Sequence, residues 1–203
     1  MKCFGVRWAK VALFGLLLSV APACDSGTDA EIASRDTVLP AMRWSHRPEA
    51  ADWTRATLSA LSAHGAALPL TTPADIDAYC PAYEDANLTD RRAFWAGLLS
   101  ALAKHESTWN PQAVGGGGRW FGLVQIAPAT ARGYGCRARS GDALKNGSAN
   151  LSCAVRILAA TVSRDGVVSR GGRGVAADWG PFHSRAKRND IAAWTAAQSY
   201  CSE

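Results

Sequence analysis

The sequence lacks the residue spacings of several common functional sites. Its six cysteines include no closely spaced pair, which excludes the usual zinc-binding patterns. The pair His105-Glu106 is followed at position 109 by tryptophan rather than histidine, so the motif of zinc proteases is absent. The glycine run at 115–118 is not followed by Gly-Lys-Ser or Gly-Lys-Thr, which excludes a phosphate loop. We therefore expect neither a metal nor a cofactor.

The chain also has little net charge once its first residues are set aside. The formal charge is +5, but Lys2, Arg7 and Lys10 precede every acidic residue. Without them 19 basic side chains face 17 acidic ones, a net charge of +2. Overall charge thus gives no support to nucleic-acid binding, although 185–188 is a basic run. We expect a monomer that binds no nucleic acid.

Long apolar runs are absent beyond the N-terminus. Residues 1–10 are basic, residues 11–20 are apolar, and the small residues Ala21-Pro22-Ala23 follow. This order is typical of an export signal, and the apolar stretch is about half the length that spans a bilayer. We predict a signal peptide over 1–23, an exported protein and no later transmembrane segment.

The cysteine count bears on the fate of Cys24. Cys3 leaves with the signal, so a retained free Cys24 would make five cysteines, an odd number in an oxidising compartment. An acylated Cys24 at the mature N-terminus leaves four, enough for two disulfides. The segment resembles a lipobox and also fits a plain Ala-x-Ala cleavage site, and we favour lipidation. Sequence allows three pairings of the four, of which we favour Cys136 with Cys153 and Cys80 with Cys201.

For the remaining chain we predict a flexible tether over 24–47 and one mainly α domain over 48–203. Residues 24–47 are polar without sustained periodicity, and helical patterns begin near residue 48. Only 113–126 could hold a small hairpin. Expected helices, with their caps in brackets, cover 48–65, 72–80 (Thr72), 88–107 (Thr89 or Asp90), 130–135, 150–163 and 189–200.

One carboxylate stands in line with apolar residues. Counting fours from Phe94 gives Leu98, Leu102 and then Glu106, which lies at the end of the expected helix. Partial burial and the negative helix end should both raise the pKa of Glu106, as a general acid near neutral pH requires. The alternative is that the apolar stripe simply ends in water at this residue.

The segments after Glu106 favour the first interpretation. In order they are Glu106-Ser107, Asn110-Pro111, the block 122–126 (Gly-Leu-Val-Gln-Ile) and 128–131 (Pro-Ala-Thr-Ala). This series resembles the lytic transglycosylases of the soluble (SLT) type, which have a lysozyme-like domain. Valine replaces their usual methionine at 124. The resemblance covers roughly residues 92–182 and implies an α+β, lysozyme-like fold with helices dominant.

The resemblance also implies an activity, a substrate and a location. The substrate is the glycan strand of peptidoglycan, cleaved between N-acetylmuramic acid and N-acetylglucosamine without water to a 1,6-anhydro product. Glu106 acts as the single acid and base, while Gln125 and Ser107 contact the substrate or support the glutamate. Gly122 belongs to the same substrate-binding block. The location is the periplasm, with membrane contact only through a lipid on Cys24.

The third block of the family departs from its pattern here. Where Ala-Tyr-Asn-x-Gly is usual, the chain has Ala-Asp-Trp-Gly over 177–180, without the Tyr-Asn pair. Trp179 could instead supply a sugar platform or fill the core. Two alternatives follow: a lysozyme-like hydrolase in which Asp178 positions a water, and a non-catalytic peptidoglycan-binding protein.

Overall fold

The computed structural model describes residues 38–202. The predicted signal peptide (1–23), the lipidation site Cys24 and residues 25–37 of the predicted tether lie outside the described residues. Within 38–202, no helix is both long and apolar enough to cross a bilayer.

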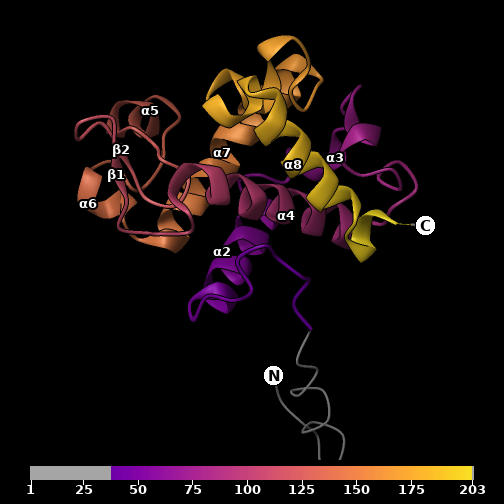
Figure 1. The fold of residues 1–203 in the computed structure, drawn as a ribbon, viewed down its shortest axis with the longest axis horizontal. Coiled ribbons are helices and arrows are strands. Elements are labelled where there is room, and N and C mark those ends of the chain that lie inside the picture. The colour runs from indigo at the N-terminus through magenta and orange to yellow at the C-terminus, as the bar shows by residue number, and fades with distance from the viewer. Residues whose placement is uncertain (1–37, 203) are drawn as a thin grey trace, which may run out of the picture. The chain divides into compact units, whose positions relative to one another are not determined.

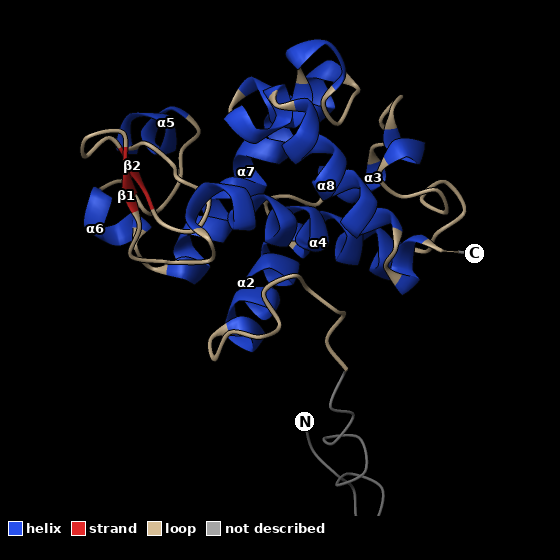
Figure 2. Cartoon of the chain, in the orientation of Figure 1, coloured by secondary structure: helices blue, strands red, loops and turns tan. Residues whose placement is uncertain are grey.

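The described chain is mainly helical with one two-stranded antiparallel sheet, as the sequence predicts (Figures 1 and 2). The α-helices are α2 (Ala50–Ser62), α3 (Ala67–Leu70), α4 (Leu88–Ser107), α5 (Pro128–Gly133), α6 (Gly141–Leu144), α7 (Gly147–Asp165) and α8 (Arg185–Ala196). The strands are β1 (Val114–Gly115) and β2 (Trp120–Phe121). Short 3₁₀ turns are η1 (Ile76–Ala78), η2 (Arg170–Gly172), η3 (Gly174–Ala177), η4 (Gly180–His183) and η5 (Ser199–Cys201).

Helix α4 forms the centre of the fold, where α2, α3 and α8 contact it (Figure 1). Every residue from Ala93 to Ala103 is buried, as expected of a helix that is apolar on all sides. Gly97 permits one close approach, because a Cβ there would collide with the hydroxyl of Tyr200. The helix ends where Thr108 takes a left-handed conformation, with φ of 51°. The last helical turn, which holds Glu106, therefore leaves the core as the chain turns away.

The small sheet lies beside α5 and α6 on one side of the domain (Figure 2). Val114 pairs with Phe121 and Gly115 with Trp120, and Phe121 also forms a bridge with Ile126. This is the hairpin predicted within 113–126. It brings the glycine run and the 122–126 block back towards the end of α4.

The last residues of the predicted tether pack as part of the domain. Met42 and Trp44 are buried, and Trp44 Nε1 donates a 3.0 Å hydrogen bond to Thr54. The boundary expected at residue 48 therefore differs from the structure, which has packed residues from about 42 onward. A short polar segment with only two buried apolar residues has no periodicity from which this could be predicted.

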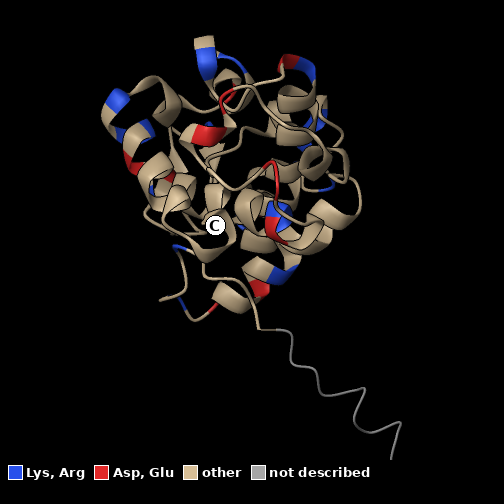
Figure 3. Cartoon of the chain, turned by 90° about the vertical axis from the view of Figure 1, so that its right-hand side faces the viewer, with Lys and Arg blue, Asp and Glu red and all other residues tan. Residues whose placement is uncertain are grey.

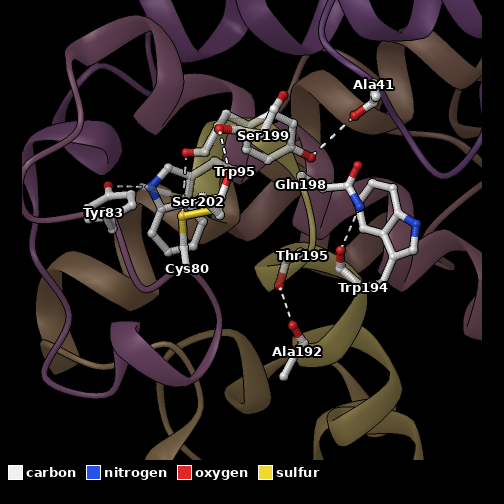
Figure 4. The surroundings of a disulfide bond; sticks show 12 residues. Ala41, Cys80, Tyr83, Trp95, Ala192, Trp194, Thr195, Gln198, Ser199 and Ser202 are labelled. Atoms are coloured by element: carbon white, nitrogen blue, oxygen red, sulfur yellow. Dashed lines mark hydrogen bonds between the residues drawn. A yellow bond between two sulfur atoms is a disulfide. The ribbon is translucent and has the colours of Figure 1, made fainter.

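Both disulfides have the favoured pairing, Cys80–Cys201 and Cys136–Cys153. The first joins the turn after η1 to the C-terminal η5, beside Trp95, whose Nε1 donates to the hydroxyl of Tyr83 at 2.8 Å (Figure 4). The second joins the chain after α5 to α7. Such cross-links stabilise a domain by roughly 2–4 kcal/mol each and persist in oxidising compartments.

Several predicted helix boundaries were wrong. The cap of α4 is Asn87, whose side chain accepts from the N–H groups of Thr89 and Asp90 at 2.8 and 3.1 Å. The α-helix predicted over 72–80 does not form, and only the 3₁₀ turn η1 (Ile76–Ala78) lies in that range. Helix α8 begins at Arg185, four residues before the predicted 189, and has Ser184 as its cap.

Candidate active site

Glu106 lies in the last turn of α4 and is partly buried. Burial raises the pKa of this carboxyl from 4.5 to about 7, while the positive charge of Lys187 acts in the opposite direction. The direction agrees with the sequence prediction, and burial is the main cause. Within residues 38–202 the carboxylate accepts no hydrogen bond from the protein, so its proton is available to a ligand.

A cavity of about 350 Å³ opens in front of Glu106. It receives side chains from α4, β2, η4, α8 and the segments between them. The lining residues are His105, Glu106, Trp120, Gln125, Asp178, Trp179, Gly180, Pro181 and Lys187. Cavities of about 520 and 540 Å³ lie elsewhere, but no carboxyl lines the second, and the one carboxylate of the first, Asp75, accepts hydrogen bonds from three backbone N–H groups. The smaller cavity is therefore the better candidate for acid-base chemistry.

Ser107 joins α4 to the 122–126 turn. Its hydroxyl donates to the carbonyl of Leu123 at 2.8 Å, with the carbonyl of Ala103 further away at 3.3 Å. Ser107 does not line the cavity. Its hydroxyl therefore joins the end of α4 to the turn that carries Gln125.

Gln125 lines the cavity with Glu106. Its backbone has a positive φ of 50°, and its amide nitrogen donates to the carbonyls of Gly122 (2.8 Å) and Ala113 (3.2 Å). A Cβ at Gly115 would overlap with the amide oxygen of Gln125. The hairpin glycine thus leaves room for this side chain, which is held in one orientation.

Gly122, expected in substrate binding, is buried and does not line the cavity. Its φ is +81°, and a Cβ there would collide with the carbonyl of Leu144 and the side chain of Asn150. Asn150 in turn accepts from Val124 N (3.0 Å) and donates to Phe121 O (3.0 Å) and Leu144 O. Glycine is required here by the packing of the turn on α7. Asn150, which the sequence analysis did not identify, holds that turn.

Two tryptophans line the cavity in different ways. Trp179 is 3% exposed, and its Nε1 donates to Val124 O at 2.8 Å, so its ring packs in the core. Trp120 is 43% exposed, and the guanidinium of Arg119 lies 4.9 Å from its ring centroid. Trp120 offers the open aromatic face that was predicted for Trp179. Its position two residues after the glycine run was the only signal in the sequence.

Asp178 meets a tyrosine from another element. The hydroxyl of Tyr134, at the end of α5, donates to Asp178 Oδ2 at 3.1 Å. Burial and the neighbouring carboxylate raise the pKa of Tyr134. A tyrosine therefore does approach the altered third block, but it comes from about 44 residues earlier in the chain.

One carboxylate fixes the helix that carries Glu106 relative to α8. Asp190 accepts two hydrogen bonds from Arg43 (2.7 and 2.9 Å) and one from His105 Nε2 (2.7 Å), with Lys104 at 3.3 Å. These partners hold the pKa of Asp190 well below its ordinary value. His105 precedes Glu106, and Lys187 lies one helical turn before Asp190. The network thus sets the distance between the glutamate and the nearby cation.

Solved structures of other proteins share the fold of this chain. The helical domain with its small sheet and cleft-lining glutamate is a lysozyme-like fold, which three solved structures titled Bd0314 DslA share. A glutamate-to-glutamine mutant is 28% identical over 78% of this chain and 96% of that chain, with a TM-score of 0.71. A second such mutant is 27% identical over 81% and 99% (TM-score 0.73), and the wild-type form 2 is 26% identical over 80% and 98% (TM-score 0.68).

The family itself is matched over the middle of the chain. Residues 86–172 match the family described as Transglycosylase SLT domain. No curated protein matches the chain. This match agrees with the resemblance seen in the motifs and supports a function of the lytic transglycosylase type on peptidoglycan. Asp178, Trp179 and Lys187 lie outside the matched residues.

Proposed function

We propose that the protein is a peptidoglycan lytic transglycosylase in which Glu106 is the single acid and base. The bond cleaved is the glycosidic bond between N-acetylmuramic acid and N-acetylglucosamine, and the product carries a 1,6-anhydromuramoyl end. The observation that supports this most directly is the glutamate whose pKa is raised to about 7 in the cleft of an SLT domain.

The first half of the reaction needs a proton donor. With a pKa of about 7, a substantial fraction of Glu106 carries its proton at neutral pH, unlike an exposed glutamate. Glu106 would donate that proton to the glycosidic oxygen as the bond to C1 of the muramoyl ring breaks. The N-acetyl group of the same sugar can support the positive charge that develops, so no second carboxylate is required.

The second half uses the same side chain as a base. The Glu106 carboxylate would take the proton from the C6 hydroxyl of the muramoyl ring, whose oxygen then bonds to C1. The glutamate recovers its proton, the ring closes and no water is consumed. Lys187 favours the carboxylate form, and burial favours the acid form. Because these two effects oppose each other, the pKa of Glu106 stays near neutral, which suits a group that must first donate a proton and then accept one.

Neighbouring side chains would orient the sugars. Trp120 presents an exposed ring for stacking, and Gln125 holds its amide at the cavity wall beside Glu106. Ser107 and Asn150 act through the backbone, because they fix the turn that carries Gln125.

Digestion of purified sacculi tests the proposal. The wild type should release muropeptides with anhydro ends, which weigh one water less than reducing ends, and Glu106→Gln should release none. Glu84→Gln is a matched control, since Glu84 is exposed and does not line the cavity. Unchanged solubilisation by Glu106→Gln would contradict the proposed role of the glutamate.

A hydrolase is the second candidate, and the position of Asp178 favours it. Asp178 lines the same cavity as Glu106, and Tyr134 holds its carboxylate. Two carboxylates flanking one bond could activate a water, as in lysozyme-like hydrolases. Reducing ends alone among the products would favour this reading. If wild type binds sacculi without cleaving them, the protein is instead a non-catalytic peptidoglycan-binding protein.

We propose that the protein acts in the periplasm with a lipid on Cys24. The two disulfides support an oxidising compartment. Labelling cells with a fatty-acid analogue tests the anchor, with Cys24→Ser as the control. Label that is absent from both proteins would argue for plain cleavage of the signal.

A further inference from the structure

A second cavity of about 520 Å³ is lined at two points by the residue that directly follows a lining residue of the catalytic cavity. Its walls come from η1, η2, η4 and the first turn of α8. The side chains that matter here are those of Tyr79, Ser169, Arg170, Phe182, His183 and Arg188. Its volume is in the range of about 300–1,000 Å³ that is common for ligand sites.

Neighbouring residues of η4 and of α8 line the two cavities. Pro181 and Lys187 line the catalytic cavity, whereas the next residues, Phe182 and Arg188, line the second cavity. The 3₁₀ turn η4 and the first turn of α8 therefore each contribute one residue to the catalytic cavity and the next residue to the second cavity. A polymer that lies in the catalytic cleft passes within a few residues of the second cavity, and a side branch on that polymer could enter it.

Two guanidinium groups are held in place at this cavity. Arg170 Nη2 donates to Ala74 O at 2.6 Å, and Arg188 Nη1 donates to Phe182 O at 2.7 Å. Neither arginine forms an ion pair with an acidic side chain in the described part of the chain. A guanidinium has five N–H donors, so each retains donors beyond the one that fixes it.

One carboxylate, that of Asp75, lines the cavity, and it accepts hydrogen bonds from backbone N–H groups. The oxygens of Asp75 accept from the N–H groups of 168–170 at 2.6, 3.0 and 2.9 Å. Asp75 thereby fixes the loop that carries Arg170. Two cations with free donors remain against one hydrogen-bonded anion, so the charge balance favours an anionic ligand.

We propose that this cavity binds the acidic stem peptide that peptidoglycan carries on its muramoyl residues. The inference rests on the proposed function, because it assumes that the glycan strand lies in the neighbouring cleft. Arginine binds carboxylates in a two-pronged geometry, and a stem peptide has several free carboxylates. Arg170 and Arg188 bind these carboxylates at the mouth of the cavity.

Binding of a free stem tetrapeptide without sugar (Ala-Glu-diaminopimelate-Ala, glutamate linked through its side chain) tests the pocket directly. Titration followed by amide NMR should shift signals of 168–174 and 180–188. Affinity should fall about tenfold or more in Arg170→Gln combined with Arg188→Gln. Arg156→Gln is the control, because Arg156 lines the cavity between α2 and α7 instead. Equal affinity in all three proteins, or shifts confined to the α2–α7 cavity, would overturn the proposal.

A cleavage assay separates this inference from the proposed function. The wild type should cleave stem-bearing glycan several-fold faster than glycan stripped of its peptides by an amidase, and the double variant should lose this preference. Thermal unfolding tests whether the variants fold. If the double variant does not fold, Arg170→Gln alone takes its place in both assays. If wild type cleaves neither substrate, the proposed function fails, and the tetrapeptide titration still decides the pocket. A preference that persists in the folded variant contradicts the inference.

Discussion

The hydroxyl of Ser107 donates a hydrogen bond of 2.8 Å to the backbone carbonyl of Leu123. It joins the helix end that carries Glu106 to the turn that carries Gln125. The glutamate and the glutamine line one cavity because this bond and the side chain of Asn150 hold the two segments together.

We expect Ser107→Ala to weaken catalysis more than folding. Loss of one hydrogen bond costs about 1 kcal/mol of unfolding free energy. The turnover rate should fall about tenfold, because small displacements of a catalytic group are costly. Ser62→Ala is the control, since Ser62 also donates to a backbone carbonyl of its own helix, at 3.0 Å. An equal loss of rate in both variants would contradict the linking role.

The raised pKa of Glu106 makes a prediction about stability. The pKa is about 7 in the folded state and 4.5 ordinarily, so the folded protein binds more protons between these values. The native state is therefore favoured below pH 4.5 and loses this advantage as pH rises through 7. Glu106→Gln should be more stable than wild type at pH 8, by on the order of 2–3 kcal/mol, with little difference at pH 4. Urea unfolding at both pH values measures this, and a constant difference would contradict it.

Lys187 should set the upper pH limit of activity. Its charge lowers the pKa of Glu106, so Lys187→Met should raise that pKa. The fall of kcat/KM at alkaline pH reports the pKa of the catalytic acid in the free enzyme, so this fall should move to higher pH. Lys145→Met is the control, because Lys145 pairs with Asp142 outside the catalytic cavity. A shift towards lower pH, or the same shift in the control, would be incompatible with this interaction.

The two cavity tryptophans should respond differently to replacement by alanine. Trp120→Ala should raise KM several-fold with little change in stability, because an exposed stacking surface is lost. Trp179→Ala should destabilise the fold by about 3–5 kcal/mol, because a buried ring is removed from the core. Substrate titrations and thermal unfolding distinguish the two effects. A Trp179→Ala variant that folds normally but binds glycan weakly would restore Trp179 as the platform.

Patterns that are local in sequence predicted the centre of the site. The stripe of Phe94, Leu98 and Leu102 placed Glu106 at a buried helix end, and the glycine run predicted the hairpin. The favoured disulfides also form. In each case the signal lies in residue spacing or in the chemistry of a single residue type.

The features that the sequence did not predict depend on contacts between residues far apart in the chain. Asp75 lies within the helix predicted over 72–80, but its carboxylate accepts hydrogen bonds from the N–H groups of 168–170. Asp190 meets Arg43 from 147 residues away, and no local pattern points to that pair. The exposure of Trp120 and the burial of Trp179 depend on which neighbours cover each ring. Basic and acidic residues are interspersed along the ribbon, so the charge pattern does not single out one element (Figure 3).

The most direct test of the central claim is the mass of muropeptides released from purified sacculi by wild type and by Glu106→Gln. The wild type should release anhydro ends, one water lighter than reducing ends, and the variant should release none. Anhydro products that persist with Glu106→Gln would contradict it.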